Sequence, residues 1–179
     1  KHYARVREFF LENNVVIYHP SRKLAKNGSF LVGENRNTYN EDTNSRFLRK
    51  SIELLDQVIE YANLFSRRDY KDATFIVRKE TFKSVSSGVH NVPEGFDLFM
   101  SDEKESEKVF GRQLWYVESV KDAIYNILKP HLKGSRAYVS LCPCLDCAMA
   151  LNAVGASKVV TLKPDFTEGV GQRWETCSV

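Results

Sequence analysis

The sequence is poor in the features that mark several protein classes. It contains only four cysteines in 179 residues, which is not the dense disulfide framework of a small secreted domain. No apolar run approaches the ~18 residues that a membrane-spanning helix needs, and no secretory signal is visible. We therefore expect reduced thiols, a cytoplasmic location and no membrane partner.

The chain also has little excess of either charge. Its formal net charge of +3 is too small to indicate a nucleic-acid partner by itself. An apolar content of 42% and a charged content of 27% are ordinary for a soluble globular protein. The length suits one α/β domain with an additional segment at one end, and it is sufficient for a sizeable core.

Apolar periodicity predicts helices that alternate with strands. The helices are expected over residues 3–12, 44–65, 114–128 and 144–154. The strands are expected over residues 15–18, 30–32, 73–77, 82–85, 136–141 and 158–162. This order indicates a three-layer α/β fold with a mixed sheet between helices. We assign residues 1–43 to an N-terminal extension and residues 44–179 to the domain.

The most informative stretch is Leu141–Ala150, which joins an expected strand to an expected helix. Cys144 and Cys147 are three residues apart at the helix start, so their side chains face the same side. The positive end of the helix dipole favours thiolates there, and two thiolates are half of a tetrahedral zinc site. The alternative is a pair of small buried cysteines on an apolar helix.

With this motif the chain resembles the cytidine and deoxycytidylate deaminase superfamily, and the deoxycytidylate branch in particular. The resemblance covers about residues 45–165, and Pro143-Cys144-x-x-Cys147 is similar to the zinc motif of that family. It implies a Zn²⁺ cofactor held by Cys144 and Cys147, and not by Cys142 or Cys177. It also implies a nucleotide pocket and homo- or hetero-oligomers of deaminase-fold subunits, which assemble through the helices around the site.

A glycine-containing stretch at residues 88–95 carries a second part of the resemblance. Gly88, Pro93 and Gly95 match the spacing of the loop that embraces the nucleotide in deoxycytidylate deaminases. His90 falls on the loop asparagine that contacts the sugar in that family. The resemblance therefore implies substrate binding by these four residues, and the alternative for His90 is a loop histidine satisfied by backbone groups.

Half of the family's catalytic motif is missing. The family uses a His or Cys as the third zinc ligand and, two residues later, a Glu that moves a proton from the attacking water to the base. No His or Cys in this sequence has a Glu two positions on. A gap-free alignment places Glu118 on the ligand position and Val120 on the proton-shuttle position. A carboxylate can bind zinc, whereas valine cannot transfer a proton.

Two other interpretations of Glu118 remain open. A rival alignment makes Glu118 the proton shuttle and Tyr116 the ligand, but it needs a two-residue insertion inside a helix, which would rotate the apolar face that follows. Glu118 can also be a surface carboxylate that pairs with Lys121 on the same helix.

These observations support three functional hypotheses. The first is a degenerate deoxycytidylate-deaminase-like protein that acts as a non-catalytic or regulatory nucleotide-binding subunit. The second is an active zinc-dependent hydrolytic deaminase of a deoxycytidine nucleotide that uses Glu118 as catalytic residue. The third is a non-catalytic subunit of a nucleic-acid deaminase, which the modest net charge does not favour. The residues leave open whether the protein is an enzyme.

Overall fold

The computed structural model describes residues 2–18, 41–66, 71–92, 116–127 and 132–162. The predicted strand at 30–32 and the candidate residues Pro93, Gly95 and Cys177 lie outside these ranges. The described strands form one mixed sheet in the order β1-β5-β4-β2-β3. The elements, in chain order, are α1 (His2–Glu12), β1 (Val16–Tyr18), α3 (Glu41–Phe65), β2 (Ala73–Val77), β3 (Ser84–Val89), α5 (Ser119–Tyr125), β4 (Arg136–Val139), α6 (Leu145–Ala153) and β5 (Lys158–Thr161).

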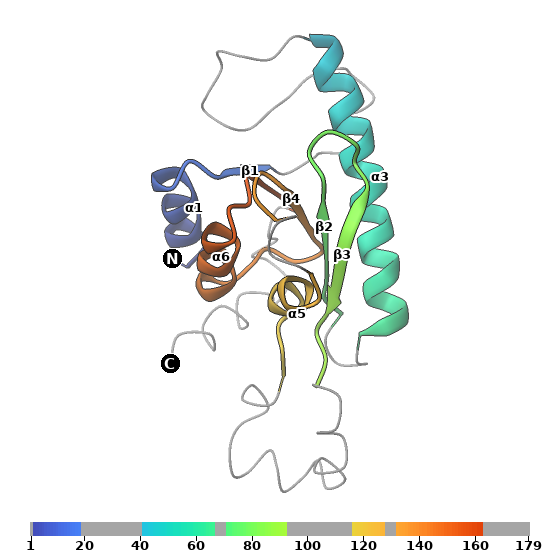
Figure 1. The fold of residues 1–179 in the computed structure, drawn as a ribbon, viewed down its shortest axis with the longest axis vertical. Helices are drawn as coiled ribbons and strands as arrows, with labels where there is room; N and C mark the ends of the chain where they lie inside the picture. Colours follow the sequence, from blue (N-terminus) through green and yellow to red (C-terminus); the bar gives the residue numbers. More distant parts are fainter. Residues whose placement is uncertain (1, 19–40, 67–70, 93–115, 128–131, 163–179) are drawn as a thin grey trace, which may run out of the picture.

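The sheet lies between two layers of helices (Figure 1). Helix α3 covers one face, where Leu55, Val58 and Ala62 pack in one cluster with Tyr138 of β4 and Val160 of β5. Helices α1, α5 and α6 cover the other face, and their apolar side chains form a second cluster with β4 and β5. The predicted three-layer α/β architecture, with a mixed sheet between helices, is therefore confirmed.

Residues near the N-terminus take part in this same sheet. Strand β1 runs parallel to β5, with Ile17 opposite Val159. In α1, Val6 and Phe10 are buried in the cluster that also contains Leu151 of α6. The assignment of residues 1–43 to an extension stays a prediction, but α1 and β1 pack on the same core as the rest of the described chain. None of the described helices has the length and apolarity needed to cross a membrane.

Strand β3 is longer than the sequence predicts. We expected a strand that ends at residue 85 and a loop at Gly88, but Gly88 lies within β3, opposite Thr74 of β2. A Cβ atom on Gly88 would lie 2.2 Å from the backbone nitrogen of Ala123 and 2.3 Å from the carbonyl oxygen of Ser119. The backbone of α5 thus packs directly on β3, which accounts for the glycine without any ligand.

Helix α5 begins later than the sequence predicts. Within the described residues it runs from Ser119 to Tyr125, whereas we expected residues 114–128. The reason is an antiparallel bridge between Val117 and Asn91, in which the Val117 N–H donates to the Asn91 carbonyl at 2.9 Å. This pairing keeps the backbone extended through Glu118, which has φ −62° and ψ 142° at the N-cap of the helix.

Candidate metal centre

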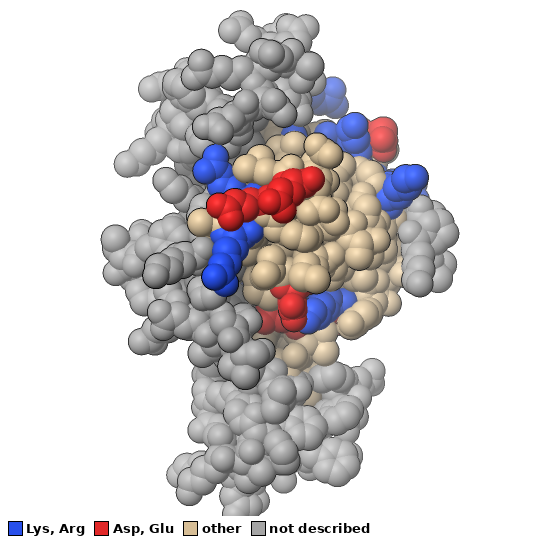
Figure 2. Space-filling view, turned by 90° about the vertical axis from the view of Figure 1, so that its left-hand side faces the viewer, with Lys and Arg blue, Asp and Glu red and all other residues tan. Residues whose placement is uncertain are grey.

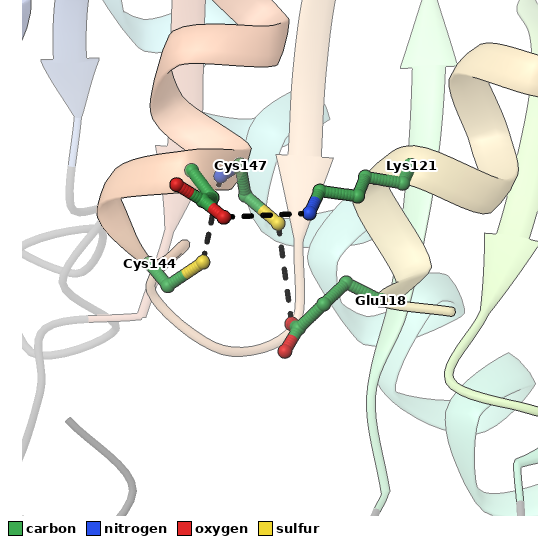
Figure 3. A network of polar contacts seen from close by, with 5 residues as sticks. Glu118, Lys121, Cys144 and Cys147 are labelled. Atoms are coloured by element: carbon green, nitrogen blue, oxygen red, sulfur yellow. Dashed lines mark hydrogen bonds and ion pairs between the residues drawn. The ribbon is translucent and has the colours of Figure 1, made fainter. Parts of the chain in front are cut away.

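Two helix starts meet at the site. Cys144 is the N-cap of α6, and its sulfur accepts a hydrogen bond from the Cys147 N–H at 3.4 Å. Glu118 is the N-cap of α5, but its side chain makes no capping bond to its own helix. Its carboxylate is instead directed toward α6, where Oε2 lies 3.9 Å from the Cys147 Sγ (Figure 3). The chain therefore brings one carboxylate and two thiols together from two separate elements.

The three side chains form a group that can hold a metal ion. One ligand atom from each of Glu118, Cys144 and Cys147 lies within 4.8 Å of the other two. Sulfur and oxygen ligands that share a tetrahedral zinc ion are about 3.6–3.8 Å apart, so only a small contraction is required. Three protein donors are the usual number in catalytic zinc sites, where water or substrate takes the fourth position. Cys142 is free and buried but is not part of this group.

The electrostatics of the group also suit a cation. Burial, followed by the charges of Cys144 and Asp72, raises the pKa of Glu118 to about 7. The pKa of Cys147 is also raised, first by its hydrogen bond with Cys144 and then by burial. Mutual repulsion and desolvation thus disfavour the ionised forms that bind metal, and a divalent cation would relieve both effects. We conclude that this donor set fits Zn²⁺.

An ion pair lies beside the donors. Lys121 of α5 contacts Asp146 of α6 at 3.6 Å, and the Asp146 side chain is 75% exposed. Burial alone would lower the pKa of Lys121, but the nearby acidic groups raise it, with Cys147 contributing most. Lys121 therefore forms an ion pair with Asp146, while its charge also acts on Glu118; the surface-carboxylate interpretation of Glu118 stays a prediction.

Val120 lies in the core beneath the donors. It is 2% exposed and belongs to the apolar cluster that also contains Val6, Cys147 and Leu151. This is the residue that the gap-free alignment places on the proton-shuttle position. An aliphatic side chain packed in this way neither donates nor accepts a proton.

His90 and Tyr116 lie together on the segments that precede α5 and follow β3. Their rings stack with centroids 5.0 Å apart and an interplanar angle of 20°. The backbone N–H of His90 donates to the Asp72 carbonyl at 3.0 Å, and burial lowers the pKa of the imidazole to about 4. His90 is therefore neutral at neutral pH. Substrate binding by His90 and Gly88 stays a prediction, as does the ligand role of Tyr116 in the rival alignment.

The sequence analysis missed one charged residue near the site. Asp72, immediately before β2, is 3% exposed, and burial raises its pKa to about 6. Its charge also acts on Glu118. In the sequence it stands in a polar stretch, and nothing in that stretch marks it as buried.

Comparison with known proteins finds similarity only among solved structures. No family model and no curated protein matches the chain. The dCMP deaminase from the cyanophage S-TIM5 in apo form is 18% identical with a TM-score of 0.45, over 71% of this chain and 94% of that one. The same enzyme in complex with dCMP and dUMP is 15% identical with a TM-score of 0.45, over 79% and 96%.

A third similar structure is Acinetobacter baumannii RibD, form 1. It is 19% identical with a TM-score of 0.45, over 72% of this chain but only 33% of RibD. The α/β architecture of this chain rests on the strands and helices described above, and at such values these similarities add nothing about its activity.

Proposed function

We propose that this protein is a degenerate deoxycytidylate-deaminase-like protein, which binds zinc through Glu118, Cys144 and Cys147 and acts as a non-catalytic or regulatory nucleotide-binding subunit. One observation carries the proposal. The three donors converge at two helix starts, while Val120, two residues after Glu118, is packed in the apolar core. The metal-binding half of the site is thus compatible with zinc, and the proton-transfer half is aliphatic.

When bound, zinc would supply Lewis-acid activation of water, but deamination also needs a group that moves protons to the base and to the leaving amine. Among the described carboxylates near the site, Asp72 is buried and accepts hydrogen bonds on both oxygens. Asp122 accepts from the Val89 N–H at 3.0 Å, and Asp146 pairs with Lys121 in solvent. None of these three replaces the shuttle, and proton transfer by a placed group is worth roughly 10²–10⁴-fold.

A second candidate function has one specific observation in its favour. The pKa of Glu118, at about 7, is close to the value that suits a general acid–base catalyst at neutral pH. Under this hypothesis the chain is an active zinc-dependent deaminase of a deoxycytidine nucleotide, in which Glu118 moves the proton and another group completes the metal site.

Zinc content measured beside turnover separates the two candidates. We expect about one zinc per chain, calorimetric binding of dCMP, and no release of ammonia from dCMP, dCTP or cytidine. Turnover that Glu118→Gln abolishes without loss of zinc would establish the active alternative. Co-purifying RNA, with no binding of dCMP, would support the non-catalytic subunit of a nucleic-acid deaminase.

Matched cysteine variants test the donor set itself. Cys144→Ala and Cys147→Ala should each abolish stoichiometric zinc, because each removes one of only two thiolate donors. Cys142→Ala removes a thiol from the same turn, but burial raises the pKa of that thiol to about 12, so zinc content should not change. Equal zinc in all three variants would show that the metal, if present, binds elsewhere.

A further inference from the structure

A single buried carboxylate joins the two segments that carry the donors. Ser119 Oγ donates to Asp72 Oδ2 at 2.7 Å, and Ser140 Oγ donates to Asp72 Oδ1 at 2.9 Å. The Leu141 N–H also bonds to the same carboxylate. Both oxygens are therefore engaged, each by a hydroxyl from a different part of the chain.

The two serines lie on the two segments that carry the candidate metal donors. Ser119 directly follows Glu118 at the start of α5, and Ser140 follows β4 and precedes the turn that leads to Cys144. One oxygen of the Asp72 carboxylate thus bonds to the residue that follows the Glu118 donor, and the other bonds to the segment that leads to the two thiol donors.

Further hydrogen bonds anchor Asp72 and its partners to the sheet. Ser140 Oγ accepts from the Ala73 N–H at 2.9 Å, and Thr74 Oγ1 lies 2.8 Å from Ser119 Oγ. The Asp72 carbonyl accepts from Ser66 Oγ at 2.8 Å. A carboxylate that is removed from water is stable only when it is satisfied in this way. The network is therefore complete, and displacing one member would leave a buried polar group unsatisfied.

We propose that Asp72 is a positioning residue, which holds the segment of Glu118 and the segment of Cys144 and Cys147 in fixed relative positions so that the three donors converge before a metal binds. The zinc part of this inference rests on the proposed function. Asp72 does not itself touch the metal or a substrate, because its oxygens are occupied by the two serines and the Leu141 N–H. Groups that hydrogen-bond directly to metal ligands typically change metal affinity by roughly 10–100-fold when they are replaced, and we expect a loss of this order when the two donor segments are no longer held together.

The test compares Asp72→Asn with two milder variants of its hydrogen-bond partners and with one control variant in the core. The asparagine keeps the volume but removes the charge and replaces one acceptor oxygen with an NH₂ group, so one serine can no longer donate to residue 72 and both contacts lose their charge-assisted strength. Ser119→Ala and Ser140→Ala each remove one hydrogen bond to Asp72 and leave the carboxylate in place. They serve as milder variants in case Asp72→Asn does not fold. Val58→Ala is the control, because it opens the core on the α3 face of the sheet, away from the site.

Two readouts are measured on each variant. The first is zinc affinity by competition with a chromophoric chelator, together with the thiolate-to-metal absorption of the cobalt-substituted protein. We expect a 10–100-fold loss of zinc affinity and an altered cobalt spectrum in Asp72→Asn, smaller losses in the two serine variants, and an unchanged spectrum in Val58→Ala. Equal affinity in Asp72→Asn and the wild type, or equal losses in Asp72→Asn and Val58→Ala, would overturn the inference.

The second readout is amide hydrogen exchange of the metal-free protein. In Asp72→Asn, exchange should rise together in residues 118–122 and 140–147, because both segments lose their hydrogen bonds to the same carboxylate. In Val58→Ala, exchange in these two segments should not rise. If the wild type binds no zinc but Asp72→Asn shows this coupled rise in exchange, the proposed metal site is refuted and the positioning role is kept. Unchanged exchange in both segments would refute the positioning role, whether or not zinc binds.

Discussion

Gly88 shows how a single residue sets the distance between a helix and the sheet. Replacing it with alanine would place a Cβ atom 2.2 Å from the Ala123 nitrogen, which α5 can avoid only by moving away from β3. We expect Gly88→Ala to lower the free energy of unfolding by at least about 1–3 kcal/mol, the usual cost of overpacking. Urea denaturation measures this change. Ser84→Ala, at an exposed position of the same strand, is the control and should change stability little.

Because α5 begins next to Glu118, Gly88→Ala should also weaken zinc binding. A variant as stable as the wild type would show that the backbone of α5 does not pack directly on Gly88.

His90 makes a pH-dependent contribution to stability whose direction can be worked out. Burial lowers its pKa in the folded protein to about 4, whereas in the unfolded chain it is about 6.5. Between these values the unfolded state binds a proton that the folded state does not, so this residue lowers stability as the pH falls from about 6.5 to 4. Asp72 and Glu118 have raised pKa values and act in the opposite direction.

The contribution of His90 is isolated by comparison with His90→Asn. The difference in urea midpoint between wild type and variant should shift in favour of the variant as the pH is lowered from 7 to 5. Parallel midpoint curves for the two proteins over this range would show that the imidazole is not buried in the folded state.

At the scale of the element, α6 presents an apolar strip away from the core. Leu145 and Met149, one helical turn apart, are 41% and 51% exposed. The side of the molecule that carries α1 and α6 shows uncharged side chains with acidic and basic ones among them (Figure 2), and the sequence analysis expects subunits to assemble through the helices around the site. We predict that Met149→Glu shifts the protein toward the monomer in light scattering at micromolar concentration.

Helix α3 provides the matched control for this prediction. Leu64 on α3 is 68% exposed but lies on the opposite layer, so Leu64→Glu should leave the assembly unchanged. A wild type that is strictly monomeric at micromolar concentration would refute the prediction that this face is a subunit interface.

The elements that sequence analysis predicted well are those whose signal is local. The apolar stripe of α3 and the Cys144 helix start each follow from residues within one or two turns. The errors arose where a distant segment decides the local structure. Val117 pairs with Asn91 and delays the start of α5, and Gly88 is set by the backbone of that helix. Asp72 belongs to the same class, because its burial depends on serines that come from two other segments.

For the molecule as a whole, the donor group depends on the relative placement of two helices on one face of the sheet. α5 packs on β2 and β3 at one edge, and α6 follows β4 in the centre. The site therefore exists only when the sheet is fully assembled. Local propensity at Glu118, Cys144 and Cys147 can start the helices, but it cannot bring the three side chains together.

Activity is the property that tests this arrangement most directly. The double change Glu118→His, Val120→Glu places a third ligand and an acid–base group two residues apart, as this chemistry requires. We expect the wild type to turn over dCMP far below an ordinary enzyme's roughly 1–10³ per second. The double variant should exceed the wild type by roughly 10²-fold or more, the usual contribution of a placed proton-transfer group. Ammonia release from dCMP measures both rates, and Glu118→His alone is the control because it still lacks the shuttle.

The new glutamate replaces a core valine that is 2% exposed, so stability should fall, and the rate must be normalised to the folded, zinc-loaded fraction. The gap-free alignment predicts that His90 replaces a sugar-contacting asparagine, so the full rate of an ordinary enzyme is not expected. Rapid turnover by the wild type would instead identify Glu118 as the proton shuttle and show that the gap-free alignment is wrong.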